Sequence, residues 1–157
     1  MEILEIKDLE TLAKKRVPKM FFDYVNSGSW TETTYNENVS DFQKIKLRQR
    51  VAIDMSNRTL ETKMINQPVS MPVAIAPTGL TGMQRADGEI LAAQAAEEYG
   101  IPYTLSTMSV CSIEAVAEKT KKPFWFQLYV MKDKKFMERL IDLSLIHISE
   151  PTRHNAI

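Results

Sequence analysis

The sequence predicts an α/β fold in which parallel strands alternate with helices. Three apolar segments, at residues 71–77, 101–107 and 124–130, have the length and composition of strands buried on both faces. A loop and a segment of helical character follow each one, so that strand, loop and helix recur nearly three times, about every 25 residues.

The N-terminal region predicts short helices followed by a strand. Apolar residues recur at helical spacing within residues 7–29, and Pro18 suits the first turn of a second helix, which Gly28 would cap. Residues 44–53 alternate apolar and basic side chains, which is typical of a half-exposed strand. We interpret the basic face as solvated, with phosphate binding as the alternative.

The helix after the first apolar strand, "ADGEILAAQAAEEYG", carries marked boundaries. Asp87 is expected at its N-cap, Glu89 complements the helix dipole in the first turn, and Gly100 stands at the C-terminal cap. Two further helices are expected at residues 112–120 and 132–143.

Composition excludes several functional classes. Twenty basic residues balance twenty acidic ones, so no overall field favours nucleic acid or an anionic membrane. No apolar run approaches the roughly 18 residues of a membrane span, and the acidic N-terminus is unlike a signal peptide. Cys111 is the single cysteine, which excludes an intrachain disulfide and a cysteine metal cluster. It is expected in a helix N-terminal turn, where a reactive thiol is the alternative to an inert one.

Small and polar residues stand where each predicted strand ends. They are Pro77, Thr78 and Gly79 after the first strand, Ser106 and Thr107 after the second, and Gln127 and Tyr129 in the third. Strand alternation puts Gln127 and Tyr129 on the face opposite Phe126. Because the carboxyl ends of parallel strands share one edge, we expect a ligand site there; polar strand ends without a ligand are the alternative.

The motifs "APTGLTGM", "GIPYTLSTMSVCSIE" and "PFWFQLYVMKD", in this order, resemble the FMN-dependent 2-hydroxy acid dehydrogenases and oxidases. "KMFFDYVNSGS" and "LRQR" extend the resemblance over residues 1–142. Within the family, "GLTGM", "LSTMSVCSIE" and "WFQLYV" most resemble the bacterial quinone-linked L-lactate dehydrogenases. Plant glycolate oxidases usually carry Ala at the position of Gly79 and Trp at that of Met108, and both departures favour the lactate dehydrogenases. The resemblance implies the N-terminal part of a (β/α)₈ TIM barrel, with about three βα units preceded by short helices and a strand-containing cap.

The resemblance also implies FMN as cofactor and assigns residues to it. Pro77, Thr78 and Gly79 resemble the segment whose backbone lies against the flavin ring. Ser106 and Gln127 resemble the polar contacts to the isoalloxazine, whose carbonyls and ring nitrogens match neutral hydroxyl and amide groups.

Two tyrosines are implied to contact substrate. Tyr129 resembles the tyrosine that orients the reacting oxygen, and Tyr24 resembles the one that binds the substrate carboxylate; an aromatic core position is the alternative for Tyr24. The catalytic histidine, substrate-binding arginine and flavin-contacting lysine of the family belong to later strands. We therefore do not interpret His147 or His154 as a general base.

The end of the chain departs from the helical pattern. "LSLIHISEPTR", which begins at Leu143, resembles the in-frame translation of a sequencing-library adapter. Residues 143–157 are therefore interpreted as a non-native tail, with a divergent natural C-terminus as the alternative.

By resemblance, the complete protein would oxidise an L-2-hydroxy acid, L-lactate to pyruvate, and pass electrons to a quinone or, alternatively, to oxygen. It would be a homo-oligomer without a nucleic-acid partner or metal, cytoplasmic or peripheral on the inner face of the cell membrane. The truncated chain is expected to be inactive. An FMN-barrel isomerase and a non-catalytic interaction fragment are the competing classes.

Overall fold

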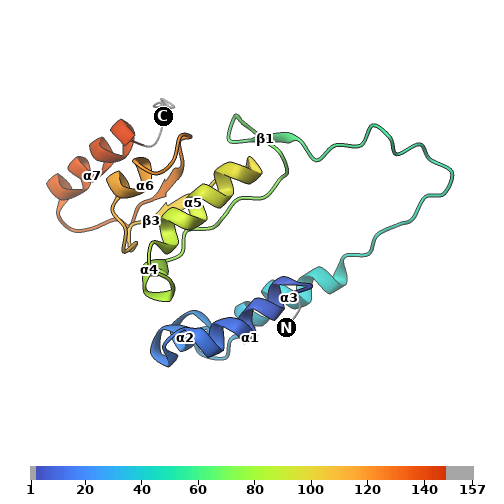
Figure 1. Cartoon of the computed structure of the whole chain (residues 1–157), viewed down its shortest axis with the longest axis horizontal. Coiled ribbons are helices and arrows are strands. Elements are labelled where there is room, and N and C mark those ends of the chain that lie inside the picture. Colours follow the sequence, from blue (N-terminus) through green and yellow to red (C-terminus); the bar gives the residue numbers. More distant parts are fainter. Residues whose placement is uncertain (1–2, 148–157) are drawn as a thin grey trace. The chain divides into compact units, whose positions relative to one another are not determined.

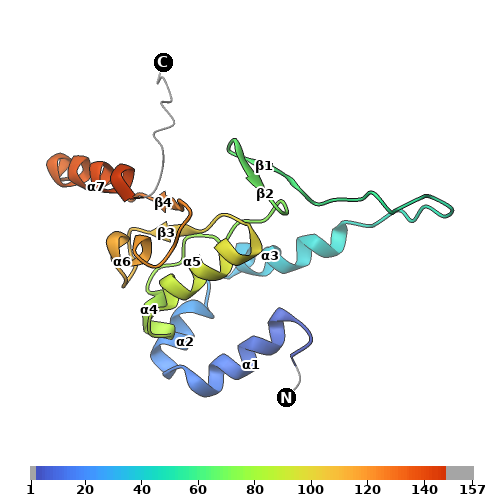
Figure 2. The ribbon, with the colours of Figure 1, turned by 45° about the horizontal axis from the view of Figure 1, so that its top comes forward.

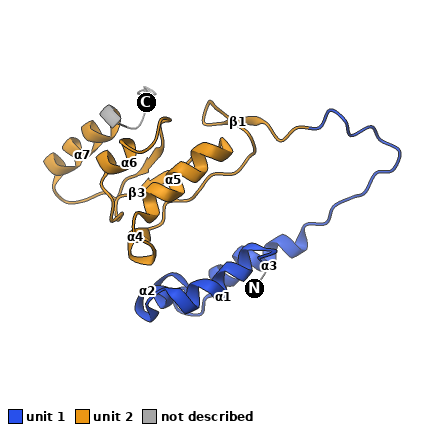
Figure 3. Ribbon diagram, in the orientation of Figure 1, with its two compact units in different colours: residues 1–58 blue, residues 59–157 orange. Residues whose placement is uncertain are grey.

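The computed structural model describes residues 3–147, and the chain divides into two units, residues 1–58 and residues 59–157 (Figure 3). Because these units are separate bodies, each is described by itself. The second unit holds all the predicted βα repeats.

The described part of the first unit, residues 3–58, contains three helices, α1 (Ile6–Arg16), α2 (Lys19–Val25) and α3 (Thr33–Lys44) (Figure 1). The two predicted short helices are confirmed, and Pro18 occupies the N-cap of α2. The expected cap at Gly28 is wrong, because α2 ends three residues earlier and Asn26 is its C-cap. Gly28 instead permits a close approach: a Cβ there would lie 2.8 Å from the Cβ of Tyr35.

The strand predicted at residues 44–53 is also wrong. This segment is irregular and its side chains are exposed, and α3 ends where it begins. Alternation is a local signal, whereas a strand needs a neighbour to satisfy its backbone hydrogen bonds, and none in the first unit pairs with it.

The second unit opens with a hairpin that the sequence pattern did not predict. Strands β1 (Thr62–Met64) and β2 (Gln67–Val69) pair antiparallel. Ile65 and Asn66 form the two-residue turn, with φ of 47° and 63°, as a hairpin of the primed turn type requires.

Parallel pairing confirms the βα organisation. Strands β3 (Thr104–Ser106) and β4 (Trp125–Gln127) run parallel, with Ser106 opposite Gln127. The first predicted strand is reduced to a single parallel bridge, Ile75 to Tyr103. The order is therefore residue 75, β3, β4, and among residues 3–147 the two outer segments each pair on one side. Figure 2 shows β3 and β4 side by side.

Within residues 59–147, this unit also has four helices: α4 (Thr81–Gln84), α5 (Gly88–Tyr99), α6 (Ile113–Ala117) and α7 (Lys134–His147). Asp87 and Gly100 are the caps of α5 as predicted, although the Asp87 side chain makes no capping hydrogen bond. Gly100 has φ of 67°, the left-handed conformation that favours glycine. Helix α7 continues past Leu143, where the helical pattern was expected to fail.

The core forms where α5 and α6 pack on β3 and β4. Its buried members are Ala93, Ala96, Tyr103, Leu105, Ile113, Val116 and Phe124. Phe126 packs against this core, as strand alternation predicted, whereas β4 ends at Gln127 and leaves Val130 exposed. On the opposite face of β4, Trp125 donates from Nε1 to Oε1 of Gln67 at 3.2 Å.

Candidate functional site

Three loops meet at the carboxyl edge of the parallel segments. The Leu80 amide donates to the Met108 carbonyl at 2.9 Å, which ties the first loop to the second. The Thr107 amide donates to the Gln127 carbonyl at 3.0 Å, which ties the second to the third. The predicted convergence of strand ends is therefore present in the second unit.

Ser106 and Gln127 form a side-chain pair across the two strands. Ser106 is buried, and its Oγ donates to Oε1 of Gln127 at 3.2 Å while accepting the Met108 amide at 3.1 Å. The amide nitrogen of Gln127 has no hydrogen bond within residues 3–147 and remains a donor for a ligand. This pairing explains how a polar residue is accommodated in an apolar strand.

Thr107 holds the backbone between Gln127 and Tyr129 in place through its side chain. Its Oγ1 donates to the carbonyl of Gln127 and accepts the amide of Tyr129 at 3.0 Å. Tyr129 itself is 53% exposed and lies two residues beyond the end of β4. The sequence pattern singled out Thr107 only as a strand-end residue, because its bonding partners lie some twenty residues away.

The first loop presents backbone rather than charged side chains. Pro77 and Thr78 are exposed and Gly79 is half-buried. The carbonyl of Thr78 accepts the hydroxyl of Thr81 at 3.1 Å, and Leu80 has φ of 56° as the chain turns into α4. The structure thus brings all the predicted cofactor residues and Tyr129 to one edge; Tyr24 is exposed on α2, in the first unit.

Glu89 is the feature that sequence reasoning missed. It was assigned to the helix dipole, yet its side chain is fully buried and Oε1 accepts the amides of Gly82 at 3.0 Å and Val110 at 2.9 Å. Oε2 has no nitrogen or oxygen donor within the described residues. The sequence could have indicated that Glu89 is buried, because Glu89, Ala93 and Ala96 have the helical spacing i, i+4, i+7 and so lie on the same, buried face of α5.

The environment of Glu89 shapes three ionisation equilibria. Burial raises the pKa of its carboxyl, but hydrogen bonds from the Val110 and Gly82 amides outweigh this and leave the pKa below its ordinary value. Burial, then the charge of Glu89, raises the pKa of the Tyr103 hydroxyl. Burial, then hydrogen bonding to Glu89 and its charge, raises the pKa of the Cys111 thiol, which argues against the reactive-thiol alternative.

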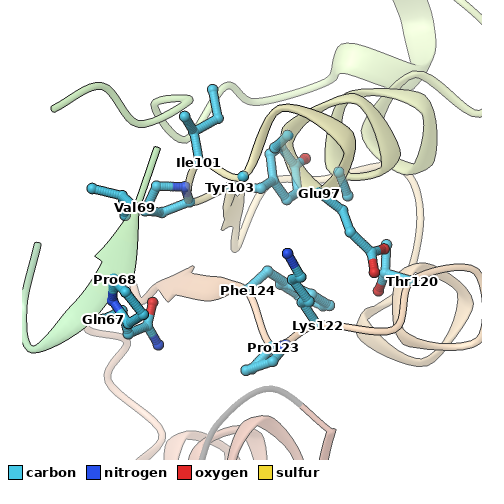
Figure 4. A pocket seen from close by; sticks show the side chains of 14 residues that line it. Gln67, Pro68, Val69, Glu97, Ile101, Tyr103, Thr120, Lys122, Pro123 and Phe124 are labelled. Atoms are coloured by element: carbon cyan, nitrogen blue, oxygen red, sulfur yellow. The ribbon is translucent and has the colours of Figure 1, made fainter. Parts of the chain in front are cut away.

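A cavity of about 270 Å³ lies at the other end of the strands (Figure 4). It is bounded by the β2 hairpin strand, by α5 and by Tyr103 and Phe124 near the amino ends of β3 and β4. Its lining is mainly apolar and includes none of the residues predicted to bind the cofactor or the substrate.

The residues at the carboxyl edge fit a flavin. They offer neutral hydroxyl and amide groups, an amide donor on Gln127 and the backbone of residues 77–79, which suit the carbonyls and nitrogens of the ring system.

Within residues 3–147, no three His, Cys, Asp or Glu side chains group to hold a metal ion. No helix in that range has the length and apolar character to cross a bilayer.

Residues 13–144 match the FMN-dependent dehydrogenase family. The chain is 49% identical over 142 residues to an L-lactate dehydrogenase of Acinetobacter baylyi, covering 90% of this chain and 37% of that protein. It therefore spans little more than a third of the length of this curated relative.

Two solved structures have the same fold over most of the chain. A soluble mutant of the membrane-associated (S)-mandelate dehydrogenase from Pseudomonas putida matches with a TM-score of 0.87 and 34% identity, over 93% of this chain and 42% of that one. A mandelate oxidase matches with a TM-score of 0.82 and 30% identity, over 90% and 41%. This likeness confirms the expected N-terminal part of a TIM barrel.

Proposed function

Because the chain belongs to the FMN-dependent dehydrogenase family, we propose that it is the N-terminal part of an enzyme that oxidises L-lactate to pyruvate. The observation that carries this proposal is the Ser106–Gln127 pair at the carboxyl edge, in a chain 49% identical to an L-lactate dehydrogenase. Fold alone would not support an activity, since one fold hosts many functions.

The first loop and the strand pair would hold the cofactor. In this proposal the backbone of Pro77, Thr78 and Gly79 lies against the flavin ring, while Ser106 and Gln127 hydrogen-bond its polar edge. When bound, FMN accepts the two electrons that leave the substrate. Support comes from the exposure of Pro77 and Thr78 and from the amide nitrogen of Gln127, which has no hydrogen bond within residues 3–147.

Tyr129 and Tyr24 would bind the substrate. A phenol can donate to and accept from a hydroxyl or developing ketone oxygen, which suits Tyr129 to orient the reacting group. The Tyr129 amide is held by Thr107, and its exposed ring is available at the edge. Tyr24 would donate to the carboxylate. The general base, a substrate-binding arginine and a flavin-contacting lysine would come from later strands, so residues 1–157 alone would be inactive.

The activity is tested with the full-length gene product. Anaerobic addition of L-lactate should bleach the oxidised flavin absorbance and yield one pyruvate per flavin, and D-lactate should not. A full-length protein that binds FMN but is not reduced by L-lactate would contradict the proposed substrate.

We further propose a quinone as electron acceptor, with oxygen as the alternative, in a homo-oligomer bound peripherally to the inner face of the cell membrane. The membrane-associated relative from P. putida supports the location. Stopped-flow reoxidation decides the acceptor: faster reoxidation by a quinone analogue than by oxygen is expected, and the reverse would identify an oxidase.

Residues 143–157 are proposed to be a non-native tail. The family match ends at residue 144, which supports this boundary. Sequencing the source DNA across the codon for Leu143 tests it. The expected reading frame continues into a fourth strand with Thr-x-Asp and later a His-Gly-Gly-Arg segment. A genome that encodes "SLIHISEPTRHNAI" followed by a stop would overturn the proposal.

A further inference from the structure

We propose that Glu89 is a positioning residue for the flavin site, whose carboxylate joins the loop after the first strand to the loop after the second. This inference rests on the proposed function, because the two loops it joins carry the residues assigned to FMN. The role differs from the helix-dipole role that the sequence suggested.

The geometry places one carboxylate oxygen between the two loops. Oε1 of Glu89 accepts the Gly82 amide at 3.0 Å and the Val110 amide at 2.9 Å. Gly82 follows Gly79 by three residues, and Val110 follows Ser106 by four. A shift of either loop would therefore break a hydrogen bond close to a residue assigned to the cofactor.

The loops also touch directly beside the carboxylate. The Leu80 amide donates to the Met108 carbonyl at 2.9 Å. A Cβ on Gly82 would lie 2.7 Å from the Cβ of Val110 and 3.0 Å from Oε2 of Glu89. The two loops are thus closely packed against each other and against the carboxylate, and little room is left for either to shift.

The negative charge of the Glu89 carboxylate strengthens its hydrogen bonds to the two loops. A carboxylate forms shorter and stronger hydrogen bonds with amides than a neutral acceptor does. The side chain is fully buried, and a buried charge is unfavourable unless hydrogen bonds compensate it. Here the Gly82 and Val110 amides donate to Oε1, so that one oxygen of the buried carboxylate is compensated and each loop is held by a charge-assisted bond.

The test uses the full-length protein and a matched control on the same helix. Glu89→Ala removes the bond to both loops, and Glu89→Gln keeps an oxygen acceptor but removes the charge. Glu97→Ala is the control: Glu97 also lies on α5 and accepts a backbone amide, that of Lys121, at 3.0 Å. Lys121 lies before β4, at the amino end of the strand, whereas the residues assigned to the cofactor lie at the carboxyl end.

Two readouts separate positioning from general stability. The Kd of FMN for the apoprotein should rise at least tenfold in Glu89→Ala, severalfold in Glu89→Gln and less than twofold in Glu97→Ala. Hydrogen exchange, measured without flavin, should show that Glu89→Ala loses protection of the Gly82 and Val110 amides, while Glu97→Ala keeps it.

Equal effects of the Glu89 and Glu97 variants on the Kd would overturn the inference, as would retained protection of both amides in Glu89→Ala. If Glu89→Ala does not fold, Glu89→Gln decides: an unchanged Kd overturns the inference. If the unsubstituted protein binds no FMN, the proposed function fails, whereas hydrogen exchange still shows whether Glu89 joins the loops.

Discussion

Ser106 and Gln127 lie opposite each other in the parallel register, and this position determines which hydrogen bonds their side chains form. Ser106 is only 3% exposed, so its hydroxyl must be hydrogen-bonded within the protein, and Gln127 supplies the acceptor at 3.2 Å. The pair holds the amide of Gln127 in one orientation, with its nitrogen available to a ligand. A preorganised donor of this kind costs less entropy when a ligand binds.

Replacing either member of the pair should weaken FMN binding in the full-length protein. We expect Ser106→Ala and Gln127→Ala each to raise the Kd of FMN, with a coupling energy of about 0.5–1.5 kcal/mol in a double-mutant cycle. Gln94→Ala is the control, because Gln94 donates to the Lys119 carbonyl away from this edge. Additive effects of the two substitutions would show that the pair does not act as a unit.

Cys111 should be an unreactive thiol despite its position before α6. Burial and the neighbouring Glu89 raise its pKa, so less thiolate is present at a given pH than in a free cysteine. At pH 8, we expect iodoacetamide to alkylate Cys111 more slowly than it alkylates the thiol of free glutathione. Mass spectrometry follows both reactions. Glu89→Gln should accelerate the reaction, and a rate equal to that of glutathione would contradict the raised pKa.

At the scale of elements, β3 is the centre of the second unit. It pairs with β4 on one side and bridges to Ile75 on the other, and α5 and α6 cover its apolar face. Leu105 in its middle is fully buried. The strand is short, yet it is the one parallel segment with a neighbour on both sides among the described residues, so its packing supports the three loops of the candidate site.

Truncating Leu105 should therefore destabilise the protein strongly. Leu105→Ala is expected to lower the free energy of unfolding of the full-length protein by about 2–5 kcal/mol, through lost burial and the cavity left behind. Leu91→Ala is the matched control, since Leu91 is 46% exposed on α5 and should cost much less. Similar unfolding midpoints in urea for the two variants would argue against this account of the core.

At the scale of the whole molecule, the chain contains too little of a barrel to close one. A TIM barrel closes with eight strands, and among the residues that the structure describes the segment at residue 75 and strand β4 each have an unpaired edge. Large apolar side chains such as Leu47, Val51 and Val130 are more than four-fifths exposed. Exposed edges and apolar surface promote aggregation.

The 157-residue chain, expressed alone, should therefore be insoluble or molten and should hold FMN weakly or not at all. Size-exclusion chromatography, flavin absorbance and thermal melting measure this. As a control, residues 1–142 fused to the remaining part of the A. baylyi relative should be soluble and yellow, because the fusion restores the missing strands. A monodisperse yellow 157-residue protein with a cooperative melt would refute the prediction.

The sequence by itself determined the features that depend on neighbouring residues. The order of βα units, the caps Asp87 and Gly100 of α5 and the polar residues at the strand ends could all be read from local spacing, and the family motifs added the cofactor. Only the tertiary structure decided the irregular path of residues 44–53, the β1–β2 hairpin and the role of Glu89. These depend on hydrogen-bond partners remote in sequence: Glu89 meets Val110 across 21 residues. A periodic pattern records which face of an element is apolar, but packing alone determines which distant groups satisfy its polar atoms.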